Sequence, residues 1–351
     1  MMPPADGGLE GRPSTPPRVS VVLPVFNALA TLPRAVASVR AQTFADWELV
    51  AVDDGSTDGS GEWLAQAAKE EPRLRVLRRP HMGLVPTLND GLAAARGEFV
   101  ARMDADDECL PDRLAAQVEM LEANPSFGVA GCLVEFAGDR AAQAGYAAHA
   151  DWLNSLVTLE QIALGRFIES PHAHPSVMFR RDLATRRGGY RDGPFPEDYE
   201  LWLRWLEAGV RMAKVPRVLL RWHDPPGRLS RTDARYAPAA FFRLKAPFLA
   251  RWLRAHAAGR TVWVAGAGRL TRRRVELIGA EGVRVAGFVD VNPRRLGVAR
   301  DGRRIIAWEK LPPPGEVFLL GYVANRGVRG PQREFLAARG WREGVDFLFA
   351  A

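Results

Sequence analysis

Apolar strands and amphipathic helices alternate through the first 130 residues, and this order constrains the fold more than any other feature. Strand-like runs such as VSVVLPVFN (residues 19–27) and WELVAV (residues 47–52) are separated by helix-like runs such as TLPRAVASVRAQ (residues 31–42). A helical crossover between two strands of one sheet makes those strands parallel. We therefore predict an α/β fold with a mostly parallel sheet that is flanked by helices.

An acidic, glycine-rich loop, DDGSTDGSG, follows the second of these strands. A calcium loop is one interpretation, because Asp54, Ser56 and Asp58 match its first, third and fifth positions. The twelfth position contradicts it, since Ala65 stands where a bidentate glutamate is required, and a strand rather than a helix precedes the loop. The loop is better placed at the carboxyl edge of the sheet, where open α/β sheets bind nucleotides.

A second acidic loop, DADDE, follows the strand that ends near Met103. Asp104 and Asp106 stand two residues apart, which suits a divalent cation that is bound together with a diphosphate. Helix capping by Asp107 or Asp112 is an equal alternative when the motif is taken alone. Strand ends of a parallel sheet share one edge, so we expect the two acidic loops to converge there.

Three motifs in this order and spacing resemble those of the family 2 glycosyltransferases. They are VVLPVFN, VDDGSTDGS and the D-x-D triplet from Asp104 to Asp106, and the resemblance covers about the first 230 residues. It implies the GT-A fold of nucleotide-diphospho-sugar transferases. It also implies transfer of a sugar from a nucleotide sugar, first of all a UDP-sugar, to a glycan or a lipid-linked acceptor in polysaccharide biosynthesis.

The same resemblance implies a donor site and a metal site. A divalent cation, Mn²⁺ or Mg²⁺, is expected on Asp106, Asp104 and His223, although an ordinary hydrogen-bonded role for His223 is the alternative. Arg228 is a further diphosphate partner on electrostatic grounds. The expected donor-nucleotide contacts are Pro24, Phe26, Asn27, Asp53, Asp54, Asp104 and Arg221.

The segment PFPEDYELWLRWLEAG (residues 194–209) begins an amphipathic helix with Glu197 and Asp198. Stabilisation of the helix dipole is the simplest role for these two acids. In the family's pattern the second acid is the general base, so the resemblance implies Asp198 for that role, with Glu197 beside it and His174 on the acceptor side. One base without a protein nucleophile implies inversion in a single displacement.

The rest of the chain suggests a second domain. We predict a lead-in at residues 1–17, a GT-A domain at 18–234, a helical connector at 235–259 and a Rossmann-like domain at 260–351. Pro247 is expected to interrupt the connector helix, which either packs between the domains or lies on a membrane surface. If the catalytic unit is self-contained, a fragment ending near Gly259 keeps its fold.

The last 92 residues hold 17 of the 48 Lys and Arg residues and 9 of the 41 Asp and Glu residues, so the positive charge of the chain is concentrated there. They open with a βαβ pattern in which Gly266, Gly268 and Asp290 occupy positions of a dinucleotide fingerprint. Thr271 replaces the third glycine. A second nucleotide site and a degenerate structural domain are both consistent with this pattern.

Composition excludes several classes of protein. Two cysteines form neither a disulfide framework nor a zinc site, and no run of 18 apolar residues occurs. We expect a cytoplasmic protein, located at the inner membrane face if the connector binds lipid, and no nucleic-acid partner. A sugar nucleotidyltransferase is disfavoured because LPVFNALATLP (residues 23–33) lacks a glycine-rich phosphate loop, and a catalytically decayed nucleotide-sugar-binding protein is disfavoured by the intact acids.

Overall fold

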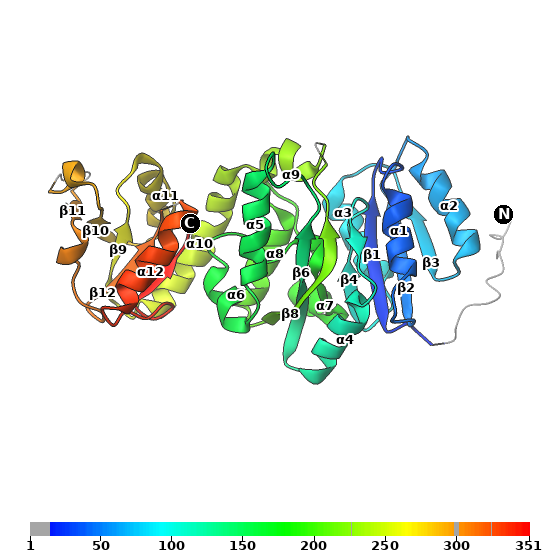
Figure 1. The fold of residues 1–351 in the computed structure, drawn as a ribbon, viewed down its shortest axis with the longest axis horizontal. Helices are drawn as coiled ribbons and strands as arrows, with labels where there is room; N and C mark the ends of the chain where they lie inside the picture. Colours follow the sequence, from blue (N-terminus) through cyan, green and yellow to red (C-terminus); the bar gives the residue numbers. More distant parts are fainter. Residues whose placement is uncertain (1–14, 226, 298–301, 324) are drawn as a thin grey trace, which may run out of the picture.

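The computed structural model describes residues 15–351 apart from residues 226, 298–301 and 324. The expected lead-in at residues 1–17 therefore lies mostly outside the described residues. Two sheets lie toward opposite ends of an elongated molecule, with helix α10 (Pro238–His256) between them (Figure 1). The larger sheet has the strand order β3-β2-β1-β4-β7-β6-β8-β5, and the smaller has the order β11-β10-β9-β12-β13.

The first half of the larger sheet is parallel and confirms the predicted alternation of strands and helices. Strands β1 and β2 are buried along their whole length because helices cover both faces of the sheet, as parallel sheets require. The elements in this half are β1 (Val19–Val25), α1 (Leu32–Arg40), β2 (Trp47–Asp53), α2 (Ser60–Glu70), β3 (Leu74–Arg78), α3 (Leu84–Ala94) and β4 (Phe99–Arg102).

The second half of the sheet is mixed. Strand β7 is antiparallel to both β4 and β6, β8 is parallel to β6, and the short β5 pairs with β8 in the antiparallel sense. Its elements are β5 (Glu108–Cys109), α4 (Arg113–Ala123), β6 (Phe127–Phe136), α5 (Ala144–Ser155), α6 (Leu159–Gly165), η1 (His174–Ser176), β7 (Met178–Arg180), α7 (Arg181–Arg187), α8 (Glu197–Glu207), β8 (Arg211–Trp222), α9 (Leu229–Thr232) and η2 (Ala234–Tyr236).

Helix α10 continues through Pro247, so the expected interruption at this residue is wrong. A proline inside a helix costs about 3 kcal/mol because it removes one hydrogen bond and crowds the preceding turn. Burial of Leu244, Leu249 and Leu253 on the same helix offsets that cost. The aromatic side chains of Phe242 and Trp252 also pack against this core.

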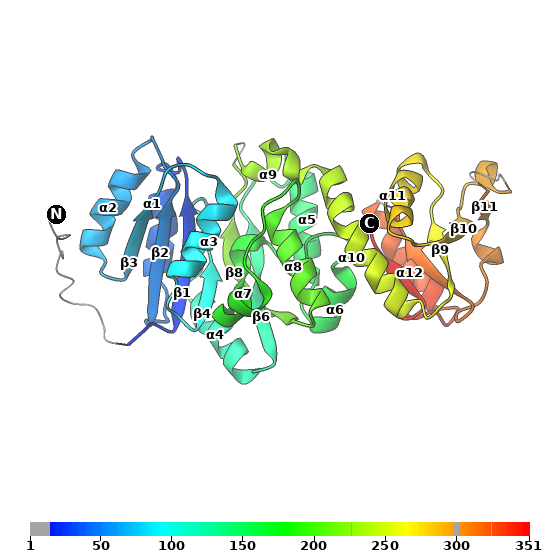
Figure 2. The ribbon, with the colours of Figure 1, turned by 180° about the vertical axis from the view of Figure 1, so that it is seen from behind.

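The C-terminal sheet is entirely parallel, and α11 and α12 lie on opposite faces of it (Figure 1, Figure 2). This is the layer order of a small doubly wound domain. Its elements are β9 (Thr261–Ala265), α11 (Arg269–Ala280), β10 (Val285–Val289), η3 (Pro293–Arg295), β11 (Arg304–Ile306), η4 (Trp308–Lys310), β12 (Val317–Gly321), η5 (Arg326–Val328), α12 (Arg329–Ala337) and β13 (Phe347–Phe349). Among the described residues, no helix combines the length and the apolar character needed to cross a membrane.

Candidate active site

A cavity of about 1000 Å³ lies at the carboxyl ends of β1 and β4 and extends to the start of α8. The edge of the sheet thus brings together residues that are far apart in the sequence, as expected for strand ends of a parallel sheet. Of the residues predicted from the sequence, those that line this cavity are Pro24, Phe26, Asn27, Asp54, Asp104, Asp106, His174, Glu197 and Asp198, and Arg228 lines it as well.

Asp54 organises the loop between β3 and α3. Its carboxylate accepts hydrogen bonds from the backbone N–H groups of Met82 (3.0 Å) and Gly83 (2.8 Å), and it lies 2.8 Å from Nδ1 of His81. The ring of His81 in turn stacks on Phe26, with centroids 4.0 Å apart. Because Phe26 is 46% exposed, this pair presents an aromatic face at one end of the cavity.

Asp53 lies outside the residues that line the cavity. It is buried at the end of β2, where one carboxylate oxygen accepts the N–H of Ser56 (3.0 Å) and the other lies 3.5 Å from Arg78. These contacts shape the first acidic loop, and Asn27 adds to them by accepting the N–H of Thr57 (2.8 Å).

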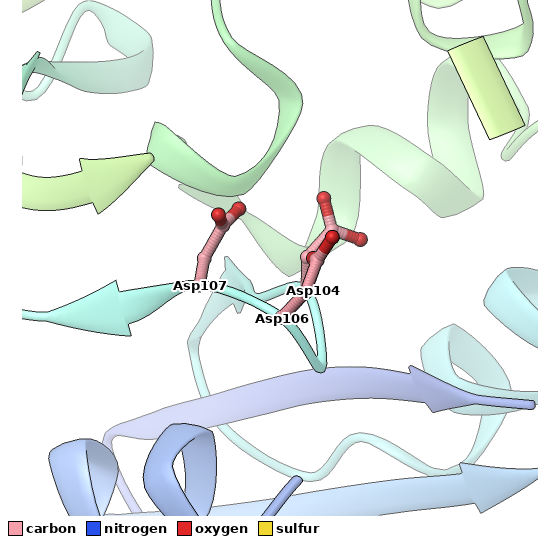
Figure 3. Close-up of side chains that lie close together, drawn as sticks. All are labelled: Asp104, Asp106 and Asp107. Atoms are coloured by element: carbon pink, nitrogen blue, oxygen red, sulfur yellow. The ribbon is translucent and has the colours of Figure 1, made fainter. Parts of the chain in front are cut away.

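Three carboxylates form a cluster on the loop that joins β4 to β5 (Figure 3). Asp104, Asp106 and Asp107 each place an oxygen within 4.8 Å of the other two. Burial and the negative charge of Asp104 raise the pKa of Asp106, and burial raises the pKa of Asp107 well above its ordinary value. One oxygen of Asp107 has no hydrogen-bond partner in the described part of the chain. Carboxylate oxygens are ligands that Mg²⁺ and Mn²⁺ prefer, and three carboxylates lie together here.

Two arginines accompany the cluster. Arg102, at the end of β4, is buried and forms an ion pair with Asp104, and Arg228 lies 3.6 Å from the other oxygen of Asp104. Burial lowers the pKa of Arg102, but the surrounding acidic groups, with Asp104 first among them, together raise the pKa above its ordinary value, so the guanidinium stays charged. Arg228 also lies over the ring of Trp222. Together the arginines place positive charge at the cavity wall, where a diphosphate could bind.

Glu197 and Asp198 are the first two residues of α8, and both line the cavity. Burial, together with the negative charge of Glu197, raises the pKa of Asp198 to about 7. Ser170 lies 3.5 Å from one oxygen of Asp198. A carboxylate with a pKa near neutrality is suited to accept a proton from a hydroxyl group.

His174 is a buried, neutral residue. Burial, with the charges of Arg102 and Arg228, lowers the pKa of His174 well below its ordinary value. Its Nε2 lies 2.7 Å from the hydroxyl of Tyr190, and its Nδ1 lies 3.9 Å from Glu197. Its hydrogen-bond partner is therefore Tyr190, and Glu197 lies nearby without a hydrogen bond to the ring.

His223 and Arg221 lie beside the cavity rather than on it. The ring of His223 contacts Glu108 (2.7 Å), and its backbone N–H donates to Asp107 (2.8 Å). Arg221 donates to Glu135 (3.0 Å). The third member of the carboxylate cluster is thus Asp107, and His223 contacts the cluster through its backbone.

The glycine-rich turn of the C-terminal domain is held by its own acid. Asp290 accepts the N–H of Ala267 (2.7 Å), between Gly266 and Gly268, and also pairs with Arg295 (3.1 Å). Its two carboxylate oxygens are used within the domain, since the second accepts the N–H of Asn292. Gly266 has a positive φ of 89°, which explains the glycine without a ligand.

Comparisons with known proteins show the family of this chain. The family model "Glycosyl transferase family 2" matches residues 20–187. The putative glycosyltransferase EpsE of Bacillus subtilis is 30% identical over 229 residues, which cover 63% of this chain and 78% of that protein. The amylovoran biosynthesis glycosyltransferase AmsE of Erwinia amylovora is 31% identical over 208 residues, or 58% and 74% of the two chains. The chain belongs to glycosyltransferase family 2.

A solved structure supports the fold. Residues 1–349 of Staphylococcus aureus TarS, crystallised with UDP-GlcNAc, match with a TM-score of 0.53 and 17% identity. The match covers 75% of this chain and 71% of the TarS chain. The GT-A fold predicted from the motifs is confirmed.

Four residues of the site are not predicted from the sequence: Arg102, Asp107, His81 and Tyr236, the last of which lines the cavity from η2. Arg102 carried a signal, because a charged residue in an otherwise apolar strand requires a buried partner, and the acids follow directly. Asp107 was considered only as a helix cap, whereas α4 begins six residues later with Asp112 as its N-cap. His81 and Tyr236 carry no local signal, since their roles depend on tertiary contacts.

Proposed function

We propose that the chain transfers a sugar from a nucleotide-diphosphate sugar to an acceptor hydroxyl with inversion of configuration. One observation carries this proposal: Asp198 lines the same cavity as Asp104 and Asp106, two members of the carboxylate cluster that Asp107 completes. A proton acceptor and a site for a departing diphosphate are the two groups that a single displacement needs.

The reaction is a direct displacement at the anomeric carbon. The acceptor oxygen forms the new bond while its proton moves to a carboxylate oxygen of Asp198. The bond between the anomeric carbon and the diphosphate oxygen breaks, and its electron pair leaves with the nucleoside diphosphate. Attack from the face opposite the leaving group inverts the configuration, and no protein nucleophile takes part.

The donor nucleotide occupies the end of the cavity near β1. The stacked rings of Phe26 and His81 offer a face for the base, and the loop organised by Asp54 encloses it. Arg102 and Arg228 provide positive charge for the diphosphate. The complex of TarS with UDP-GlcNAc is consistent with a nucleotide-sugar donor, and we propose a UDP-sugar first.

A divalent cation fits the carboxylate cluster. Asp106 and Asp104 would hold it, although the Asp104 carboxylate also pairs with Arg102 and Arg228. The carboxylate oxygen of Asp107 without a hydrogen-bond partner belongs to the same cluster. When bound, Mn²⁺ or Mg²⁺ supplies positive charge that stabilises the departing diphosphate. The acceptor is a glycan or a lipid-linked acceptor, in keeping with the biosynthetic role in the name of AmsE, the amylovoran biosynthesis glycosyltransferase.

Nucleotide titrations test the donor site. UDP, GDP and dTDP are titrated against the wild type, with and without Mn²⁺, and against Asp106→Asn. We expect at least one nucleotide to bind in a manganese-dependent way and to lose about tenfold or more in affinity in the variant. Asp112→Asn, an exposed aspartate six residues away that pairs with Arg217, is the matched control. Equal, metal-independent binding to all three proteins would remove the metal assignment.

A further inference from the structure

Tyr236 belongs to the segment that leads out of the catalytic domain, yet it contacts the acid pair at the start of α8. It is the last residue of η2, two residues before the start of helix α10 at Pro238, and it lines the cavity. Its hydroxyl donates a hydrogen bond of 2.6 Å to Glu197, which is 2% exposed. No feature of the family motifs points to this contact, because 39 residues separate the partners.

The environment of the acid pair makes this hydrogen bond consequential. Burial raises the pKa of Glu197, and the hydrogen bond from Tyr236 opposes that change by favouring the carboxylate. The charged and titratable groups that face the pair come from every neighbouring element: Arg102 of β4, His174 of η1, Tyr190 before α8, and Arg235 with Tyr236 of η2. His174 is neutral, so the positive charges are those of the two arginines.

We infer that Tyr236 is a positioning residue, which holds Glu197 as a carboxylate next to Asp198 and thereby makes Asp198 the stronger proton acceptor of the two. The inference rests on the proposed role of Asp198 as the base. Two adjacent carboxylates share their protons, and a hydrogen bond to a carboxylate favours its charged form. Asp198 accepts the backbone N–H of Tyr199 (2.7 Å) and lies 3.5 Å from Ser170, whereas the short hydrogen bond from a phenol is made to Glu197 alone. The proton is thereby directed to Asp198, the residue that faces the acceptor.

If Tyr236 contributed packing alone, removal of its hydroxyl would have a different result. Tyr236 would then hold η2 against α8 through its ring, and the hydroxyl would have no effect on which acid carries the proton. Tyr236→Phe separates the two possibilities, because it keeps the ring and removes only the donor.

Carboxyl ¹³C NMR measures the distribution of the proton without any substrate. The protein is labelled at the aspartate side-chain carboxyl carbon, and the resonance of Asp198 is assigned by its loss in Asp198→Asn. In the wild type we expect this resonance to titrate near neutral pH. In Tyr236→Phe its midpoint should fall by about one pH unit, because Glu197 then competes for the proton.

Glu197→Gln provides a second variant that does not depend on Tyr236. It removes the neighbouring negative charge, so the midpoint of Asp198 should again fall, and adding Tyr236→Phe to it should produce no further change. Tyr322→Phe is the matched control, since this buried tyrosine lies in the C-terminal domain and its hydroxyl has no hydrogen-bond partner among the described residues. Its Asp198 midpoint should equal that of the wild type.

An unchanged Asp198 midpoint in Tyr236→Phe, or an additional fall in the double variant, would overturn the inference. The proposed function fails separately: an Asp198→Asn enzyme with near-normal turnover would remove the base while leaving the NMR result intact. In the active enzyme, the lower Asp198 midpoint leaves more of this base ionised at acidic pH, so the ratio of Tyr236→Phe turnover to wild-type turnover should be several-fold higher at pH 6 than at pH 9. A structural defect would lower turnover equally at both pH values.

Discussion

Asp198 combines two requirements that conflict at the scale of a single residue. The cavity wall buries its carboxyl beside Glu197, which destabilises the ionised form, while proton transfer requires that form. The charge of Glu197 is visible in the sequence as the preceding residue, but burial is a tertiary effect, so the sequence identifies Asp198 as a base only through the family pattern. The ionised Asp198 therefore lowers the free energy of unfolding, as residues in active sites commonly do.

Asp198→Asn should therefore stabilise the fold at alkaline pH. Because the folded-state pKa of about 7 lies above the unfolded value, stability from this group is fully present below the unfolded pKa and is lost as the pH rises through 7. The variant cannot ionise, so its melting temperature should exceed that of the wild type at pH 8 and approach it at pH 5. In Asp112→Asn, which loses a carboxylate whose pKa is lowered by Arg217, no such gain is expected. An equal effect of Asp198→Asn at both pH values would contradict this explanation.

At the scale of elements, α10 connects the catalytic domain to the C-terminal sheet. The buried amino group of Lys245 donates to the carbonyls of Phe167 (2.7 Å), Ile168 (3.3 Å) and Ala350 (2.7 Å). The first two carbonyls directly precede the cavity-lining residues Glu169 and Ser170. One side chain thus fixes the connector, a wall of the active site and the end of the chain relative to one another.

Lys245→Met should destabilise the protein. The two side chains have similar volumes, so the main change is the loss of the hydrogen-bond donor. It leaves three buried carbonyl groups without their donor, at a cost of at least about 1–3 kcal/mol. Thermal unfolding should show a melting temperature several degrees lower. Lys310→Met, at an exposed lysine of the C-terminal domain, should leave it unchanged. If both variants melted like the wild type, the three hydrogen bonds would be energetically unimportant.

The predictions from sequence succeeded where local pattern determines structure. Asp104 and Asp106 could be placed at the edge of the sheet because an apolar strand directly precedes them, and the parallel order fixes where that strand ends. Asp107 could not be assigned to the carboxylate cluster, because the hydrogen bond that holds it comes from the N–H of His223, 116 residues away. Tyr236 was missed for the same reason. Contacts between distant segments leave no periodic signal in the sequence.

In the whole molecule, one hydrophobic cluster joins helix α8 beside the larger sheet to the C-terminal sheet. Tyr199 and Leu203 of α8 belong to the same cluster as Leu249 of α10 and Phe318 of β12. Helix α10 therefore packs against α8 on one side and against the C-terminal sheet on the other, as its position between the two sheets suggests (Figure 2). The division into separate domains near residue 259 stays a prediction, and the shared cluster makes the catalytic unit less independent than the sequence suggested.

A fragment that ends at Gly259 should be less stable than the full chain. Removing residues 260–351 exposes the apolar side chains of α10 that face the C-terminal sheet, and exposed apolar patches promote aggregation. Thermal unfolding and size-exclusion chromatography should show a lower melting temperature and aggregation. A monomeric fragment with the melting temperature and donor hydrolysis of the full chain would show that the catalytic unit is self-contained.

The central claim is that Asp198 accepts the proton while the carboxylate cluster serves the diphosphate. The most direct test is the single-turnover rate of sugar transfer by Asp198→Asn, measured beside the affinity for the donor nucleotide. We expect a rate lower by about 10²- to 10⁴-fold with donor affinity almost unchanged, because the amide keeps the shape but cannot accept the proton. Transfer by Asp198→Asn at a rate near that of the wild type would contradict it.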